Sequence, residues 1–174
     1  MGAIEDLRDL VSEVPAAQQE VTAEEFEAFY KAQHGGSTEV EIRTDLSLVR
    51  LSAGMYENGK PTNRIININR PWDIRVYFGL TGDLYKLICG KWCVSVNFES
   101  IGPGREFRLT HPEFYFDCHH QYWCVRIPGR GVLPTDCTTP YKVVVTVAAK
   151  SKCDEPVAIL GFVGLPEVQF YDAH

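Results

Sequence analysis

The chain has 174 residues, of which 45% are hydrophobic and 23% are charged, and its formal net charge is −6. These values are typical of one globular domain with a short appendage, and they argue against a disordered chain. The uninterrupted apolar runs are far too short to cross a bilayer, so we expect no integral membrane segment.

The charge is distributed unevenly along the chain. Residues 1–40 contain nine acidic and only two basic residues, which leaves the remainder close to neutral. A protein without a basic face is poorly suited to a phosphate backbone, so nucleic acid is not an expected partner. The first residues lack the basic flank and apolar core of a secretory signal. We therefore expect a cytoplasmic protein whose six cysteines are reduced.

Two short helices are predicted near the N-terminus. The first has an apolar stripe at spacings of three and four residues, formed by Ile4, Leu7, Leu10 and Val11. Pro15 ends this helix, and residues 16–20 are expected to form a flexible connector.

The second helix has a complete start signal. Thr22 is a good capping residue, and Glu25 stands at the position that completes a capping box. Phe26, Phe29 and Tyr30 form an apolar edge that is expected to dock onto the body of the protein. Residues 1–36 are thus predicted to be an acidic helical arm, and residues 37–174 the main domain.

After this arm the hydrophobic period falls from about 3.6 to about 2, as in strands whose side chains alternate between two faces. Four runs alternate clearly, beginning at Trp72, Trp92, Trp123 and Tyr141. The three tryptophans occupy the apolar side and are predicted to be core residues. Weaker strand candidates are residues 39–43, 46–51, 64–69, 85–89, 106–109, 113–118, 157–162 and 168–171.

Turn sequences lie between these runs, among them residues 57–61, 89–91 and 102–104. Short strands without interleaved helices predict a mainly β fold, either an antiparallel β-sandwich or, as the alternative, a barrel. The sandwich is favoured because residues 89–91 suggest a tight hairpin. In addition, strands with one apolar face need a second sheet to cover them.

Residues 111–124 contain several side chains of the kinds that bind zinc. Cys118 and Cys124 are too far apart for the usual close pair of ligands. The adjacent His119 and His120 are expected to point to opposite sides of an extended backbone. A metal-dependent enzyme that uses these two histidines with His111 is therefore only an alternative, and we expect no metal or other cofactor.

Cys89 and Cys93 have three residues between them, where a thioredoxin-like redox motif has two. The two thiols are expected to approach each other across the hairpin at residues 89–91. Buried, unreactive cysteines are nevertheless the favoured interpretation, because cysteine commonly behaves as a small hydrophobic residue.

Residues 99–106 form a loop with several reactive groups. Its glycines expose backbone amides, and Glu99, Arg105 and Glu106 make it a candidate ligand-binding loop. The loop matches neither the P-loop nor the dinucleotide-binding pattern, and a rigid, salt-linked connection between sheets is favoured. With 11% aromatic residues in the chain, a carbohydrate-binding or small-molecule-binding sandwich remains the second hypothesis.

No convergent catalytic set is recognisable, so the leading hypothesis is a non-catalytic accessory or interaction protein. Its partner is expected to be another protein or a second copy of the chain. The binding surface is either an exposed sheet face or the first helix, which is too short to be stable alone. On the first helix, the partner-binding residues are predicted to be Ile4, Leu7, Leu10 and Val11.

Overall fold

The computed structural model describes residues 17–32, 48–62, 64–81, 89–117, 119–129 and 139–172. This part of the chain contains eleven strands and one helix, α1 (Ala23–Ala32). Sheet A has the strand order β1 (Ala17–Glu20), β9 (Tyr122–Pro128), β5 (Trp72–Thr81), β2 (Leu48–Glu57) and β3 (Lys60–Pro61). Sheet B has the order β4 (Ile65–Asn67), β11 (Pro156–Tyr171), β10 (Pro140–Lys150), β6 (Gly90–Ser100) and β7 (Phe107–Thr110), with β8 (Phe114–Phe116) paired to the start of β6.

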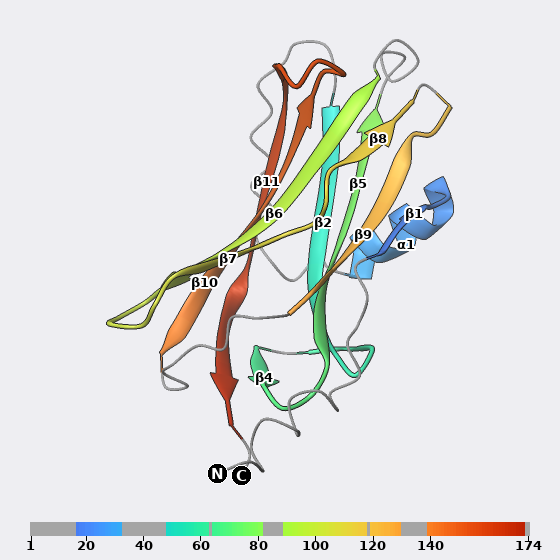
Figure 1. Ribbon diagram of the computed structural model, residues 1–174. Coiled ribbons are helices and arrows are strands. Elements are labelled where there is room, and N and C mark those ends of the chain that lie inside the picture. The colour runs from blue at the N-terminus through green and yellow to red at the C-terminus, as the bar shows by residue number, and fades with distance from the viewer. Residues whose placement is uncertain are drawn as a thin grey trace, which may run out of the picture.

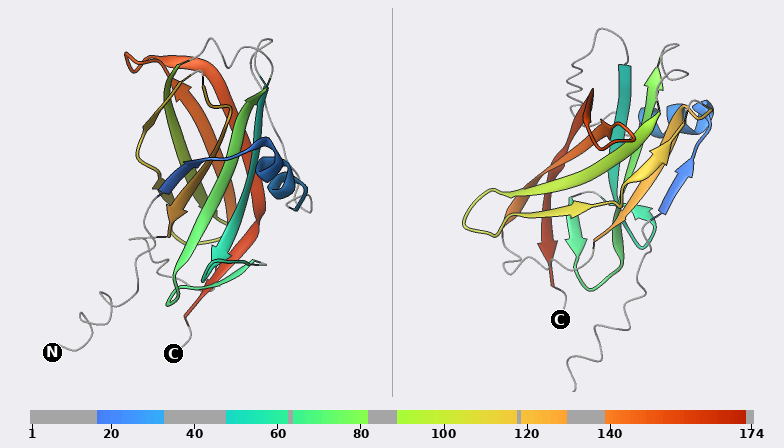
Figure 2. Two further views of the ribbon diagram at one scale, coloured as in Figure 1. Left: turned by 90° about the vertical axis from the view of Figure 1, so that its right-hand side faces the viewer. Right: turned by 45° about the horizontal axis from the view of Figure 1, so that its top comes forward.

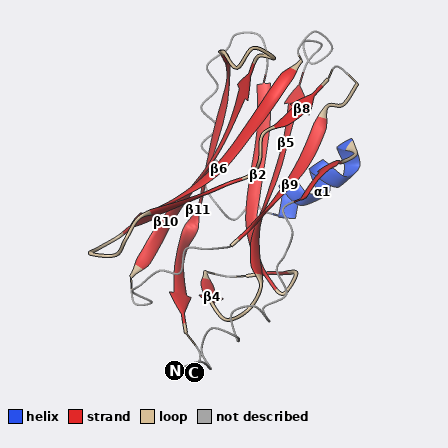
Figure 3. Ribbon diagram, viewed as in Figure 1, coloured by secondary structure: helices blue, strands red, loops and turns tan. Residues whose placement is uncertain are grey.

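The two sheets lie against each other along the length of the molecule (Figure 1). Every strand pair is antiparallel except β4 with β11, which is parallel. The mainly β prediction is confirmed, since strands dominate and α1 is the one helix of the described residues (Figure 3). The predicted sandwich agrees with the two layers, whereas its purely antiparallel character does not hold for sheet B.

One apolar cluster fills the space between the sheets. Its ring contacts cross from sheet A to sheet B, with centroids 5.0 Å apart for Phe78 and Trp92 and 6.1 Å apart for Trp72 and Phe98. Trp72, Trp92 and Trp123 are 5%, 0% and 3% exposed, which confirms the prediction that the tryptophans are core residues.

The four clearly alternating runs became β5, β6, β9 and β10. Among the weaker candidates, residues 46–51 overlap β2 and residues 106–109 overlap β7, whereas residues 64–69 and 113–118 contain the short strands β4 and β8. The candidate at residues 39–43 and most of that at residues 85–89 lie outside the described residues. The predicted turn at residues 57–61 is a two-residue hairpin, in which Asn58 and Gly59 have positive φ of 50° and 75°.

The predicted hairpin at residues 89–91 is wrong, because Gly90 is the first residue of β6 and pairs with Phe116. A Cβ atom on Gly90 would lie 2.1 Å from the carbonyl oxygen of Lys150, so this glycine permits close packing of backbones and does not form a turn. Cys89 and Cys93 therefore do not face each other across a turn.

The two strands predicted at residues 157–162 and 168–171 are one strand, β11. Its pairing with β10 shifts in register between Tyr141 and Val143, opposite Pro166. Proline has no N–H group to donate to the hydrogen-bond ladder. The register shift places Pro166 at a position where the ladder needs no N–H donor. The gap between the two predicted strands, residues 163–167, is therefore a bulge within β11 and not a turn.

The N-terminal region differs from the prediction in one respect. The flexible connector predicted at residues 16–20 is wrong for its described part, because β1 pairs residue by residue with β9. The second helix is confirmed, with the Thr22 N–H donating to Glu25 (2.8 Å) and the Glu25 N–H donating to Thr22 Oγ1 (3.2 Å). The first predicted helix lies outside the described residues.

Candidate functional site

The outward side of sheet B is the candidate interaction surface. Along β6, β10 and β11, the outward side chains alternate with the core residues. The outward side chains at the centre of the sheet are all uncharged. We call this surface the open face, and it consists of Cys93, Ser95, Asn97, Val144, Thr146, Ala148, Phe162 and Gly164. Within the described part of the chain, no helix or strand lies over it (Figures 1 and 2).

Thr146 lies at the centre of the open face, between Ser95 on β6 and Phe162 on β11. Ser95 is only 5% exposed and accepts a hydrogen bond from Arg108 of β7 at 2.9 Å. The guanidinium of Arg108 therefore lies at the margin of the open face, beside the outermost strand of sheet B.

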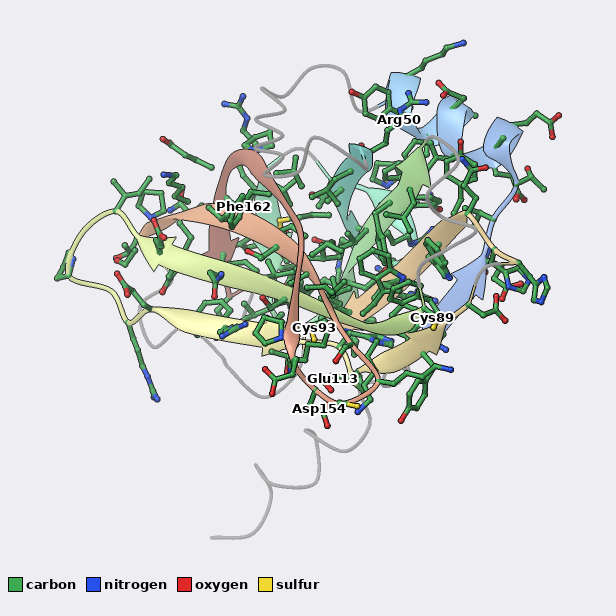
Figure 4. The ribbon with its side chains drawn as sticks, turned by 90° about the horizontal axis from the view of Figure 1, so that it is seen from above. Arg50, Cys89, Cys93, Glu113, Asp154 and Phe162 are labelled. Atoms are coloured by element: carbon green, nitrogen blue, oxygen red, sulfur yellow. The ribbon has the colours of Figure 1, made fainter. Side chains whose placement is uncertain are left out.

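One end of the open face is closed by a charged network. Lys150 Nζ is 2.5 Å from Glu113 Oε1, and the thiol of Cys93 donates to the same oxygen at 3.3 Å. Figure 4 shows Cys93 and Glu113 beside each other at this end of the sheet. Lys91 pairs with Asp154 at 2.6 Å. The charges at this margin are thus neutralised within the chain.

These contacts change the acidity of the groups involved. The Lys150 ammonium, and next the Cys93 thiol, lower the pKa of Glu113. Burial, and next the hydrogen bond to Glu113, raise the pKa of Cys93. A thiol that holds its proton is a poor nucleophile. Cys93 is therefore suited to packing and not to covalent chemistry.

The outward side of sheet A differs because α1 covers part of it (Figure 2). Phe26 contacts Tyr122 at a centroid distance of 4.9 Å, and Phe29 stacks on Tyr77 at 3.7 Å. Arg50 lies over the Phe26 ring at 5.2 Å and pairs with Glu27. The prediction that the second helix docks through its aromatic edge is confirmed.

The rest of this side carries a polar network around a buried carboxylate. Asp73 is 1% exposed and accepts hydrogen bonds from Arg75 Nε at 3.1 Å and Arg126 Nε at 3.0 Å. Burial raises the pKa of both Tyr77 and Cys124, which lie beside it. Asp73 is paired with arginines, and the raised pKa keeps the Cys124 thiol protonated. The network can therefore hold sheet A together, but it offers no activated nucleophile.

The predicted ligand-binding loop is not assembled into a site. Glu99, Arg105 and Glu106 are all exposed, and no ion pair joins them among the described residues. The loop connects β6 to β7, which are neighbours in sheet B, so the predicted salt-linked connection between sheets is wrong. The buried Tyr141 anchors it, because the Tyr141 hydroxyl donates to the carbonyl oxygen of Arg105 at 3.2 Å.

The three predicted histidines occupy different surroundings. His111 is 8% exposed and packs edge-on against Phe114, with Nδ1 2.7 Å from the carbonyl oxygen of Pro112. His119 is exposed. His120 lies between two carboxylates, 2.6 Å from Glu20 and 3.2 Å from Asp117. Among the described residues, no group of three or more His, Cys, Asp and Glu side chains is arranged to hold a metal ion.

The partner-binding residues predicted on the first helix, Ile4, Leu7, Leu10 and Val11, lie outside the described residues. The described part of the chain contains no helix long and apolar enough to cross a membrane. Four cysteines are described, and Cys89, Cys93, Cys124 and Cys153 all have free thiols.

The structure contains a cavity that was not predicted from the sequence. It has a volume of about 540 Å³ and lies beside the β2–β3 hairpin, β4 and the end of β11. Glu57, Lys60, Arg70 and Tyr171 are among its lining residues. Of its walls, the sequence predicted only the turn at residues 57–61. The other walls come together through the pairing of β4 with β11, which no local sequence pattern predicts.

Neither a protein-family model nor a curated protein sequence matches this chain.

Proposed function

We propose that this chain is a non-catalytic, cytoplasmic interaction protein that pairs with a second copy of itself through the open face of sheet B. The observation that carries the proposal is the uncharged centre of the open face, with no described element over it. Stable protein interfaces have centres depleted of charge and margins that are polar. The free thiols of the described cysteines support the cytoplasmic location.

The charges around the open face favour a second copy as the partner. Glu113 and Asp154 are already paired with lysines of the same chain, so this end of the open face offers little net charge to an oppositely charged protein. A two-fold pair brings the same patch of both copies together, and an uncharged patch is compatible with itself. Such a pair would bury Val144, Thr146 and Phe162.

The helical arm of residues 1–36 is the second surface to which we assign a role in binding. In its described part, β1 is the edge strand of sheet A and α1 packs against that sheet. We retain the proposal that Ile4, Leu7, Leu10 and Val11 contact a partner. The arm and the open face are tested with separate variants.

The test places a charge in the centre of the open face. We expect Thr146→Lys to weaken self-association at least about tenfold in sedimentation equilibrium, because pairing would bury an unpartnered ammonium. Gln19→Lys is the matched control, since Gln19 is exposed on β1 of the other sheet. Deleting residues 1–15 tests the arm. If only the deletion dissociates the pair, the arm is the interface, and a wild-type protein that stays monomeric contradicts self-pairing.

A further inference from the structure

The cavity between the β2–β3 hairpin and the end of β11 has two chemically different walls. One wall is apolar and exposed, with Ile65 at 61% and Tyr171 at 38% of their maximal exposure. The other carries the cations Lys60 and Arg70. We call it the Tyr171 cavity. Its volume of about 540 Å³ falls in the range of small-molecule sites, roughly 300–1,000 Å³.

The walls of the Tyr171 cavity are fixed by hydrogen bonds between the segments that form it. The Asn58 N–H donates to the carbonyl oxygen of Pro71 at 2.8 Å, and the Ile68 N–H donates to that of Tyr171 at 3.0 Å. The Thr62 hydroxyl donates to the carbonyl oxygen of Ile65 at 3.0 Å. A cavity held in this way exists before a ligand arrives, which lowers the cost of binding.

Glu57 orients the guanidinium of Arg70. Its Oε1 accepts from Arg70 at 3.1 Å, and its Oε2 accepts from the Asn67 N–H at 3.0 Å. The Glu57 side chain is 15% exposed, whereas that of Arg70 is 55% exposed. Glu57 engages Nη1 of the guanidinium, and its other N–H donors have no further partner among the described residues. A guanidinium held in this way is suited to an acidic group of a ligand.

We propose that the Tyr171 cavity binds a sugar ring that carries one acidic group, such as a uronate or a sulfated sugar. The C–H face of the ring stacks on Tyr171, and the acidic group accepts hydrogen bonds from Arg70 and Lys60. The side-chain amide of Asn58 and the acceptor lone pairs of the Thr62 hydroxyl remain for the sugar hydroxyls. A purely apolar carboxylate would leave these polar groups unmatched, and a neutral sugar would leave Lys60 without an anionic partner among the described residues.

Titration calorimetry on the full chain tests the proposal with four probes: a glucuronate-containing disaccharide, its sulfated counterpart without uronate, a neutral disaccharide, and inorganic sulfate. We expect one or both acidic sugars to bind at least about tenfold more tightly than the neutral sugar and sulfate, as loss of a charged hydrogen bond predicts. Which acidic sugar binds identifies the group. Equal binding of the neutral sugar, equal binding of sulfate alone, or no binding of any sugar overturns the proposal.

Variants locate the site. Tyr171→Ala and Lys60→Gln should each weaken binding of the acidic sugar several-fold, and Lys60→Gln leaves the Glu57–Arg70 pair intact. Tyr115→Ala is the matched control, because Tyr115 is a 68% exposed tyrosine on β8, outside the cavity. Unchanged affinity in both cavity variants, with melting temperatures like that of the wild type, places the sugar elsewhere and overturns the assignment.

Discussion

Trp92 shows how single side chains organise the core. It is fully buried, and its ring lies 4.5 Å from Phe116, 5.0 Å from Phe78 and 5.4 Å from Trp123. Trp92→Ala should lower the free energy of unfolding by about 3–5 kcal/mol, because it opens a cavity that these rings cannot fill. Urea denaturation measures this. The exposed Tyr115→Ala is the control and should change stability by less than about 0.5 kcal/mol.

The indole nitrogen of Trp92 gives this prediction a second test. Trp92 Nε1 is buried and has no hydrogen-bond partner among the residues that the structure describes. A buried, unpaired donor costs about 1–3 kcal/mol, and Trp92→Phe removes it while keeping a ring in place. We therefore expect Trp92→Phe to be much less destabilising than Trp92→Ala. A loss of stability in Trp92→Phe as large as that in Trp92→Ala would contradict this expectation.

The thiols should differ in reactivity according to their surroundings. Burial raises the pKa of Cys93 and Cys124, whereas Cys89 and Cys153 are exposed. Since the thiolate is the reactive form, a maleimide at neutral pH should label Cys89 and Cys153 first. Peptide mass spectrometry over a time course gives the order. In urea all six cysteines should label as free thiols, and labelling of Cys124 as fast as Cys153 in the native protein would contradict the prediction.

At the scale of elements, α1 was predictable because its signals are local. The reciprocal hydrogen bonds of Thr22 and Glu25 appear as a spacing of three residues in the sequence, and its aromatic edge appears as a helical stripe. β1 was not predictable, because Ala17–Glu20 has no alternation of apolar residues. An edge strand with exposed side chains depends on backbone pairing with β9, and that pairing leaves no local trace in the sequence.

The capping box of α1 makes a specific prediction. Thr22→Ala should cost about 1 kcal/mol of stability, because it leaves the Glu25 N–H without its acceptor. Glu25→Ala removes the reverse bond to the Thr22 N–H. Since each residue satisfies the other, the double variant should cost less than the two single losses added together. Urea denaturation of the four proteins measures the coupling, and strict additivity would show that the two bonds act separately.

At the scale of the whole molecule, the two candidate surfaces differ in how far the sequence predicts them. The open face follows from strand alternation, since Val144 and Thr146 occupy the phase opposite to the core residues of β10. The Tyr171 cavity does not follow from any local pattern. Ile65 and Tyr171 are far apart in sequence and meet only because β4 pairs with the last residues of β11. Strand order is decided by long-range pairing, and hydrophobic alternation carries no information about it.

Ion pairs between distant segments should make the whole fold sensitive to acid. Lys150 lowers the pKa of Glu113, Lys91 that of Asp154, and Arg50 that of Glu27. In the unfolded chain these carboxyls return to ordinary values of 4.5 for Glu and 3.8 for Asp. In that range the unfolded state binds more protons than the folded state. The stabilisation is therefore present above the ordinary values and is lost as the pH falls through the lower folded ones.

We expect the melting temperature to fall as the pH drops from 5 toward 3, and Glu113→Gln to reduce the slope because it removes one of these carboxyls. Added salt should flatten the profile as well, because the pairs are exposed and are screened. Glu106→Gln is the matched control, since Glu106 is exposed and forms no ion pair among the described residues. A Glu113→Gln profile parallel to that of the wild type would show that the pair closing the end of the open face does not contribute to folding. Its role would then be confined to the margin of the proposed interface, where the same variant should still change self-association.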